Sequence, residues 1–83
     1  MTEQELKEQV NIRITAWGAP NQYDVVDYIV EGLMDGAEGM YLYHNERNCS
    51  LAVRDTDRSG YERDDLCVIG FFINGDVLET VDY

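Results

Sequence analysis

Residues 24–38 read DVVDYIVEGLMDGAE and carry two helical patterns at once. Successive acidic residues are three, four, four and three positions apart. Because each helical residue turns the chain by ~100°, this spacing gathers the carboxylates into one narrow arc. The acidic arc comprises Asp24, Asp27, Glu31, Asp35 and Glu38. The opposite arc is apolar, which predicts a helix with one buried face, and it comprises Val25, Val26, Ile29, Val30 and Leu33.

The acidic arc contains no cation, because no Lys or Arg occurs between Arg13 and Arg47. Like charges four positions apart destabilise a helix by roughly 0.2–0.5 kcal/mol per pair, and ordinary helices interleave Lys to avoid this cost. At a rise of ~1.5 Å per residue, neighbouring charges would lie about 5–6 Å apart, close to the phosphate spacing of a nucleic-acid strand. We interpret the arc as a surface that imitates a phosphate backbone. The alternative is a solvated helix face that merely lacks lysine.

The length and charge of the chain set the class of partner. The 83 residues predict one domain spanning residues 1–83, and a hydrophobic content of 45% is typical of a folded chain. The net charge of −11 opposes direct binding of nucleic acid or an anionic membrane and favours a cationic partner. Residues 64–83 contain no Lys or Arg and supply a secondary acidic surface, so we expect negative charge over most of one side. The residues of this surface are Asp64, Asp65, Asp76 and Glu79.

The sequence predicts a cytoplasmic protein. Residues 1–5 are acidic and polar, the reverse of a secretory signal, and no apolar run approaches the ~18 residues of a membrane span. Cys49 and Cys67 match no paired zinc spacing. Both fall in apolar strand patterns, so we expect small buried side chains in a reducing compartment, with a disulfide as the alternative.

The first part of the chain is expected to be helical. Thr2 and Glu5 form a capping-box pair, and apolar residues then recur at helical spacing up to Trp17. Val10–Trp17 also alternates like a strand with β-branched residues, and we favour the helix because of the cap. Asn21 is expected to cap the acidic helix, which would run to about Asp35. Two glycines, Gly36 and Gly39, would end it.

The second part of the chain is expected to form a meander of strands. The strands are predicted at residues 40–44, 49–54, 66–73 and 77–81, with the apolar run 66–73 in the centre and a polar loop at 55–65. Asn74-Gly75 is a strong two-residue hairpin signal. The last strand would be an edge, protected against edge pairing by Asp76, Glu79 and Asp82.

The predicted fold is therefore α+β, with two N-terminal helices packed on a three- to four-stranded antiparallel sheet. If Val10–Trp17 were a strand, the order would be β-α-β-β-β-β. The predicted core comprises Leu6, Val10, Ile14, Trp17, Val26, Ile29, Val30, Leu33, Leu42, Leu51, Val53, Cys67, Ile69, Phe71, Ile73 and Leu78.

No motif in the sequence predicts catalysis or a cofactor. Residues 55–60 resemble the first half of an EF-hand calcium loop, but Leu66 replaces the bidentate Glu and Arg58 adds positive charge. We therefore favour a solvent-exposed turn with Asp–Arg pairing. His44 is the sole histidine, and no nucleophile pairs with it in the sequence. We expect a protein that is not an enzyme and has no cofactor or metal.

The tyrosines are candidate anchors for a partner. Tyr28 falls at the border of the acidic arc, where its ring could stack on a partner's arginine. Tyr41 and Tyr43 share one face of the first predicted strand. The alternative for this second pair is that the two rings simply cover the sheet.

In size, charge and carboxylate layout, the chain resembles small acidic inhibitors encoded by phages and mobile elements. These include DNA-mimic anti-restriction proteins, uracil-DNA glycosylase inhibitors and anti-CRISPR proteins. The resemblance implies inhibition by occupancy of a basic nucleic-acid channel, in a CRISPR effector, a restriction enzyme or a repair enzyme within the host cytoplasm. The expected partner-binding residues are Asp24, Asp27, Tyr28, Glu31, Asp35 and Glu38. An immunity protein or antitoxin that neutralises a cationic nuclease toxin is the alternative, and a calcium-responsive binding module is a third hypothesis.

Overall fold

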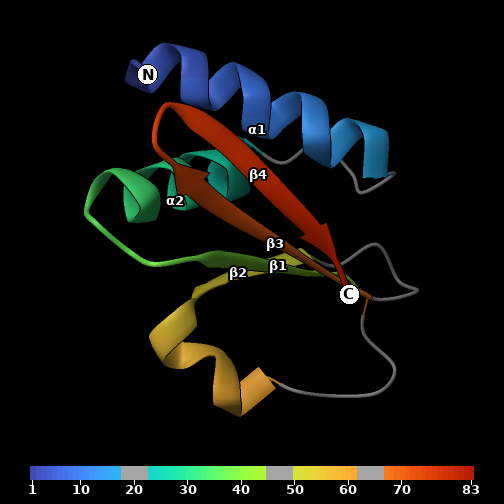
Figure 1. Ribbon diagram of the computed structural model, residues 1–83. Helices are drawn as coiled ribbons and strands as arrows, with labels where there is room; N and C mark the ends of the chain where they lie inside the picture. Colours follow the sequence, from blue (N-terminus) through green and yellow to red (C-terminus); the bar gives the residue numbers. More distant parts are fainter. Residues whose placement is uncertain (18–22, 45–49, 62–66) are drawn as a thin grey trace.

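Within residues 1–17, 23–44, 50–61 and 67–83, which the computed structural model describes, two α-helices lie on one face of a four-stranded antiparallel sheet (Figure 1). This is the predicted α+β fold. The elements in chain order are α1 (Glu3–Trp17), α2 (Tyr23–Met34), β1 (Met40–His44), β2 (Ser50–Arg54), η1 (Asp55–Tyr61), β3 (Cys67–Asn74) and β4 (Val77–Asp82). The predicted helix cap at Asn21 lies outside the described residues.

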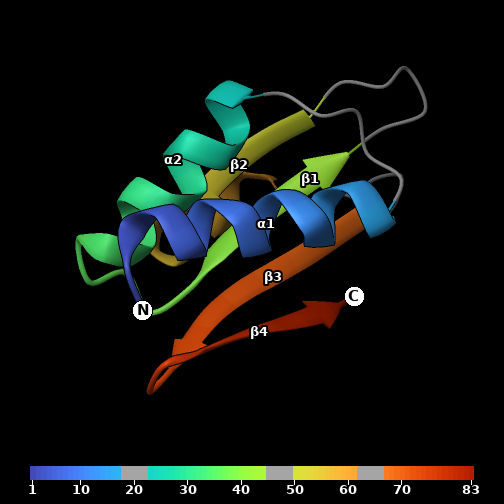
Figure 2. The same cartoon turned by 90° about the horizontal axis from the view of Figure 1, so that it is seen from above.

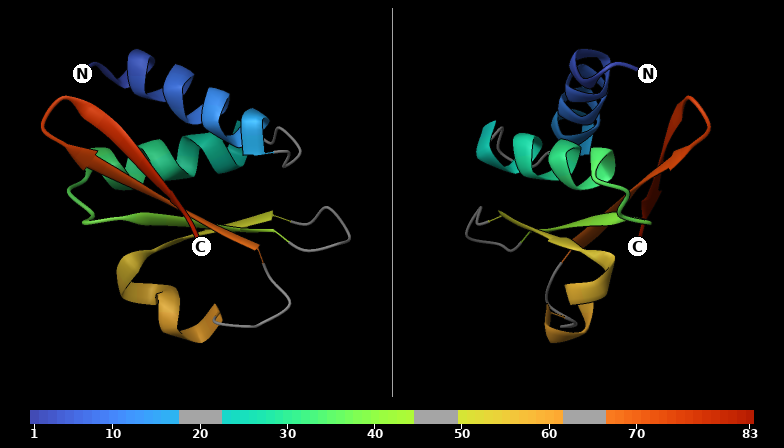
Figure 3. Two further views of the ribbon diagram at one scale, coloured as in Figure 1. Left: turned by 45° about the vertical axis from the view of Figure 1, so that its right-hand side comes forward. Right: turned by 90° about the vertical axis from the view of Figure 1, so that its left-hand side faces the viewer.

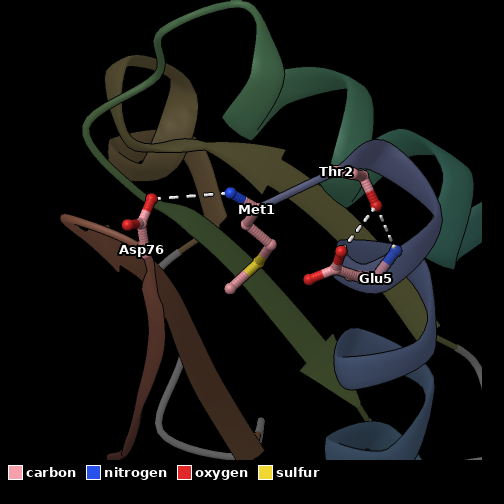
Figure 4. Close-up of polar contacts among 4 residues, drawn as sticks. All are labelled: Met1, Thr2, Glu5 and Asp76. Atoms are coloured by element: carbon pink, nitrogen blue, oxygen red, sulfur yellow. Dashed lines mark hydrogen bonds and ion pairs between the residues drawn. The ribbon is translucent and has the colours of Figure 1, made fainter.

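Helix α1 begins at the predicted cap. The hydroxyl of Thr2 accepts a hydrogen bond from the Glu5 amide and donates one to the Glu5 carboxylate, both at 3.2 Å (Figure 4). The first of these bonds satisfies an amide that the first helical turn leaves without an intrahelical partner, and the second holds the two side chains together. The strand interpretation of Val10–Trp17 is wrong. It would have placed Ile12 on the buried face, whereas the helix leaves 63% of Ile12 exposed.

Helix α2 ends at Met34, and a turn follows. The chain turns at Gly36, whose φ of +92° is rarely adopted by residues with a side chain. Its amide donates to the carbonyl of Leu33, and the next amide donates to the carbonyl of Gly32. Glu38 therefore lies beyond the helix, so the prediction that it continues one helical arc is wrong.

The sheet is not a simple meander. Its strand order is β2-β1-β3-β4, so β3 pairs with β1 rather than with β2 (Figure 1). The apolar run of β3 is interior, as predicted, because it is flanked by β1 and β4. Helix α2 lies over β2 and β1, and α1 lies beside it toward β4 (Figure 2).

The main core lies between the helices and the sheet. Its buried residues are Leu6, Val10, Ile14, Val26, Ile29, Val30, Leu33, Met40, Leu42, Ile69, Phe71 and Leu78. Trp17 packs against this core but is only partly buried. Leu51, Cys67 and Ile73 were predicted to be buried and are exposed; each lies at or next to the end of its strand. Cys67 is a free thiol, and Cys49 lies outside the described residues.

A 3-10 helix covers part of the other face of the sheet. The segment Asp55–Tyr61 was predicted to be a loop, but it forms η1, which lies opposite the two α-helices (Figure 3). Near it, Tyr41, Tyr43 and Val53 form a second buried cluster. Burial of these tyrosines on the face away from the α-helices requires a covering element, and the polar composition of η1 concealed that role.

Candidate acidic interface

The described carboxylates of α2 and the turn after it all face solvent. Asp27 and Glu31 lie on the outer side of α2, and Asp35 and Glu38 follow in the turn. Tyr28 lies beside them with 44% of its surface exposed. Asp24 belongs to α2, but its side chain lies outside the described part of the structure.

Cations from distant parts of the chain reach this row. The ammonium group of Lys7 lies 3.5 Å from Asp27 and 3.9 Å from Glu3. The guanidinium of Arg54 lies 2.8 Å from Asp35. The expectation of a row without cations is therefore wrong at two positions, because the fold supplies what the local sequence lacks. Among the described residues, Glu31 and Glu38 carry no ion pair.

Two shallow depressions meet at the Arg54–Asp35 pair. The first, about 360 Å³, is lined by Glu3, Glu31 and Met34 in addition to the pair. The second, about 340 Å³, adds Glu38 and Asp55 together with the backbone of the turn and Thr56. We call the carboxylates around Arg54 the α2 acidic surface; it comprises Glu3, Glu31, Asp35, Glu38 and Asp55.

The sequence did not indicate two of these carboxylates. Glu3 lies in the first turn of α1, far from α2 in the sequence, and Asp55 was assigned to a calcium-like loop. Glu3 reaches the surface because α1 packs on α2, and Asp55 because it directly follows β2, which packs under α2. No local spacing rule predicts such an arrangement.

Arg54 is held as a cation at this surface. Its hydrogen bond to Asp35 is the largest cause of a raised pKa, and the charges of Tyr28 and Asp57 act in the same direction, against a smaller effect of burial. The pair is solvent-exposed, so water screens it and a competing cation can replace Arg54 at little cost. The five carboxylates thus surround one guanidinium that is exchangeable.

The secondary acidic surface is separate from the first. Asp76 lies 3.5 Å from the amino group of Met1 (Figure 4), and Glu79 accepts a hydrogen bond from Asn74 at 3.2 Å. Both residues belong to the β3–β4 hairpin, at the sheet edge opposite β2. The expectation of continuous negative charge over one side is therefore wrong for these residues. Asp64 and Asp65 lie outside the described residues.

The tyrosines of β1 serve the fold. The guanidinium of Arg58 lies 4.1 Å from the ring centroid of Tyr41 and 5.0 Å from that of Tyr83, and its Nε donates to the hydroxyl of Tyr43 at 3.2 Å. Burial is the main reason that the pKa of Tyr41 is raised, with Tyr83 adding to it and Arg58 opposing it. Tyr41 and Tyr43 are 8% and 3% exposed, so the interpretation that they cover the sheet is confirmed.

In the structure, the calcium-like segment forms the 3-10 helix η1, and His44 packs against an aromatic ring. Asp55 and Asp57 lie in the first turn of η1, and Arg58 turns inward onto the tyrosines, so the predicted Asp–Arg turn is not what forms. In the described part of the chain, no cluster of three or more His, Cys, Asp or Glu side chains is arranged to hold a metal ion. The ring of His44 packs edge-on against Trp17, with centroids 5.9 Å apart.

The structure thus brings Glu31, Asp35 and Glu38 together and places Asp27 at the other end of the row, beside Lys7. Among the described helices, none has the length and apolar character needed to cross a bilayer. Comparison of the chain with protein-family models, curated proteins and solved structures found no match.

Proposed function

We propose that this protein is a non-catalytic inhibitor that occupies the basic nucleic-acid channel of another protein. The observation that carries the proposal is the α2 acidic surface, where five exposed or half-exposed carboxylates surround Arg54 and the one further cation paired with them in the described structure is Lys7, at Glu3. Such a surface is complementary to the Arg and Lys clusters that bind phosphates. The targets that fit are CRISPR effectors, restriction enzymes and repair enzymes in the cytoplasm of a host cell.

The position of the carboxylates supports fast and specific association. Glu31 is fixed on a helix, and Asp35 and Glu38 follow in a hydrogen-bonded turn, so little ordering is needed on binding. The field of a protein with a net charge of −11 also steers cationic partners toward it.

An arginine of the target has a specific place to bind. It would compete with Arg54 for Asp35, and carboxylate–guanidinium contacts are among the strongest hydrogen bonds that proteins form. Tyr28 and Met34, 44% and 55% exposed, flank the carboxylates and offer apolar contact area. The proposed site therefore combines exchangeable charge with two anchors, and it keeps Asp27 as a peripheral contact.

The test is competition for DNA. Purified representatives of the three target classes are mixed with fluorescent DNA and titrated with the wild type, with a Glu31→Lys/Glu38→Lys variant, and with a Gln4→Lys/Glu8→Lys/Gln9→Lys control of equal net charge. All the substituted side chains are exposed, so the substitutions leave the fold intact. We expect the wild type and the control to release DNA from one target, and the first variant to be weaker by roughly 30-fold or more.

Equal inhibition by the wild type and the first variant would refute the assigned surface. Loss of inhibition in both variants would show that net charge alone drives binding, which would also refute it. Neutralisation of a nuclease toxin in cells, without release of DNA from any of the three targets, would replace the proposal with an immunity function.

A further inference from the structure

Strand β4 leaves one row of backbone hydrogen-bonding groups open. Within the described sheet, β3 is the one neighbour of β4. The amide of Tyr83 donates to the carbonyl of Val68 at 3.0 Å, which makes Val68 and Tyr83 a hydrogen-bonded pair. Such pairs alternate along an antiparallel ladder. The N–H and C=O groups of Leu78, Thr80 and Asp82 therefore point away from β3, toward the open edge.

The side chains of this edge form an apolar strip. Val77, Val81 and Tyr83 alternate along β4 on the face that is turned away from the helices, and they are 59%, 43% and 58% exposed. Glu79 interrupts the strip in its centre. Helix α1 covers the other face, where the indole of Trp17 donates to Asp82 at 3.2 Å. One face of an added strand would thus meet apolar side chains and one carboxylate.

The charges near the edge select the kind of strand that can pair. The described residues 67–83 include Asp76, Glu79 and Asp82 and contain no Lys or Arg. A second copy of this chain would bring like charges into register, and two chains of net charge −11 repel each other. A cationic strand would instead place opposite charges across from these carboxylates.

We propose that the open edge of β4 pairs with an extended basic segment of a partner protein, in which a Lys or Arg is flanked two positions away on each side by an apolar residue, so that all three side chains lie on one face. The segment adds a fifth strand, and its backbone bonds to the open groups of Leu78, Thr80 and Asp82. Its two apolar side chains pack on Val77 and Val81, and the cation between them on the same face lies across from Glu79. This interface lies at the opposite edge of the sheet from the α2 acidic surface and does not depend on the function proposed above.

The test uses a capped peptide of about seven residues, the length of a typical strand, with Lys in the centre, Val two positions away on each side, and Thr elsewhere. The control probe is the same peptide with Glu in place of Lys. Amide hydrogen exchange of the full chain is measured by NMR with and without each peptide. We expect the Lys peptide to slow exchange at Leu78, Thr80 and Asp82 by about tenfold while the residues between them change little, because those already bond to β3.

A proline substitution tests the backbone contact directly. The Thr80 amide points outward, so Thr80→Pro removes an edge donor without removing a bond to β3. Thr80→Val is the matched control, because it keeps the amide. We expect the proline variant to bind the Lys peptide about tenfold more weakly and the valine variant to bind as the wild type does. Glu79→Lys, at an exposed position, is a second variant that should also lose binding even if the proline disturbs the fold.

Three results would overturn the proposal. The first is an absence of the alternating protection pattern with the Lys peptide. The second is equal binding of the Lys and Glu peptides, or of the wild type and Glu79→Lys. The third is a wild-type dimer in sedimentation that Thr80→Pro converts to monomer, since a second copy would then occupy the edge. The Glu31→Lys/Glu38→Lys variant should bind the Lys peptide normally, which separates this interface from the proposed inhibitory surface.

Discussion

Substitution of Arg58 by Met would test how η1 is held on the sheet. Met keeps much of the length and the apolar character of the side chain but removes its charge and its donors. Without the guanidinium, neither the stacking on Tyr41 and Tyr83, at 4.1 and 5.0 Å, nor the hydrogen bond to Tyr43 can form. Each stacking interaction of this kind contributes about 0.5–1 kcal/mol, and the hydrogen bond about 1 kcal/mol. We therefore expect the free energy of unfolding to fall by about 2–3 kcal/mol.

This is a large part of the roughly 5–15 kcal/mol that stabilises a typical domain. For a domain of this size, each 1 kcal/mol lowers Tm by about 4–8 °C, so we expect a fall of roughly 10–20 °C. The assay is thermal and urea unfolding followed by circular dichroism. Arg54→Met is the matched control, because Arg54 makes an exposed ion pair and its removal should change Tm little.

The dependence of Tm on salt concentration separates the tyrosine interactions of Arg58 from a long-range charge effect. The guanidinium of Arg58 lies partly buried against aromatic rings, so the fall in Tm should persist when salt is raised from about 0.1 M to about 1 M. An Arg58→Met protein whose Tm equals that of the wild type would refute the view that Arg58 anchors η1. A fall in Tm that vanishes in high salt would show that a long-range charge effect, and not the tyrosine interactions, is responsible.

Three further substitutions test other parts of the structure. Asn11→Leu should raise the free energy of unfolding by about 1 kcal/mol, because Asn11 Oδ1 is buried without a hydrogen-bond partner among the described residues; an unchanged or lower Tm would contradict this. Burial raises the pKa of Tyr41, so its contribution to stability is complete below pH ~10, the ordinary tyrosine pKa, and is lost as pH rises through the folded-state pKa. Tyr41→Phe should therefore flatten the alkaline fall in stability, and a profile identical to that of the wild type would refute the assignment. Gly36→Ala should cost about 1–2 kcal/mol through its positive φ alone, since the space around it is open, while Gly36→Asn should cost less; equal Tm values for the Ala variant and the wild type would rule out a backbone requirement.

The hydrophobic periodicity of the sequence predicted the helices and strands, because each of them depends on residues that are close together in the chain. Thr2 and Glu5 cap α1 within one turn, and the valines of α2 follow a single helical face. The same reasoning failed where it assumed that a pattern continues. Glu38 keeps the helical spacing in sequence, but the turn at Gly36 ends the helix before it.

The remaining errors concern contacts between segments that are distant in the sequence. Arg54 neutralises Asp35 because β2 packs under α2, and nothing near either residue predicts that pairing. The strand order could not be read from the chain because β3 inserts beside β1 after the η1 segment. The sequence left two interpretations of Tyr41 and Tyr43 open, because their contacts with Arg58 of η1 join segments that are distant in the chain.

The two arginines of residues 54–58 allow stability and binding to be separated. Arg58 stabilises η1, whereas Arg54 is an exchangeable cation within the α2 acidic surface. Asp55 belongs to both regions, but its amide donates to the carbonyl of Gly39 at 3.1 Å, so its position is fixed independently of Arg58.

Arg58→Met should therefore lower Tm but still release DNA from the target at a temperature well below its Tm. Glu31→Lys/Glu38→Lys should keep the Tm of the wild type but fail to release DNA. Neither carboxylate has an ion pair in the described structure, so their replacement affects only the contacts with the target. If Arg58→Met abolished inhibition while still folded, the interface would extend onto η1 and the tyrosine face. The α2 acidic surface alone would then be too small to explain binding.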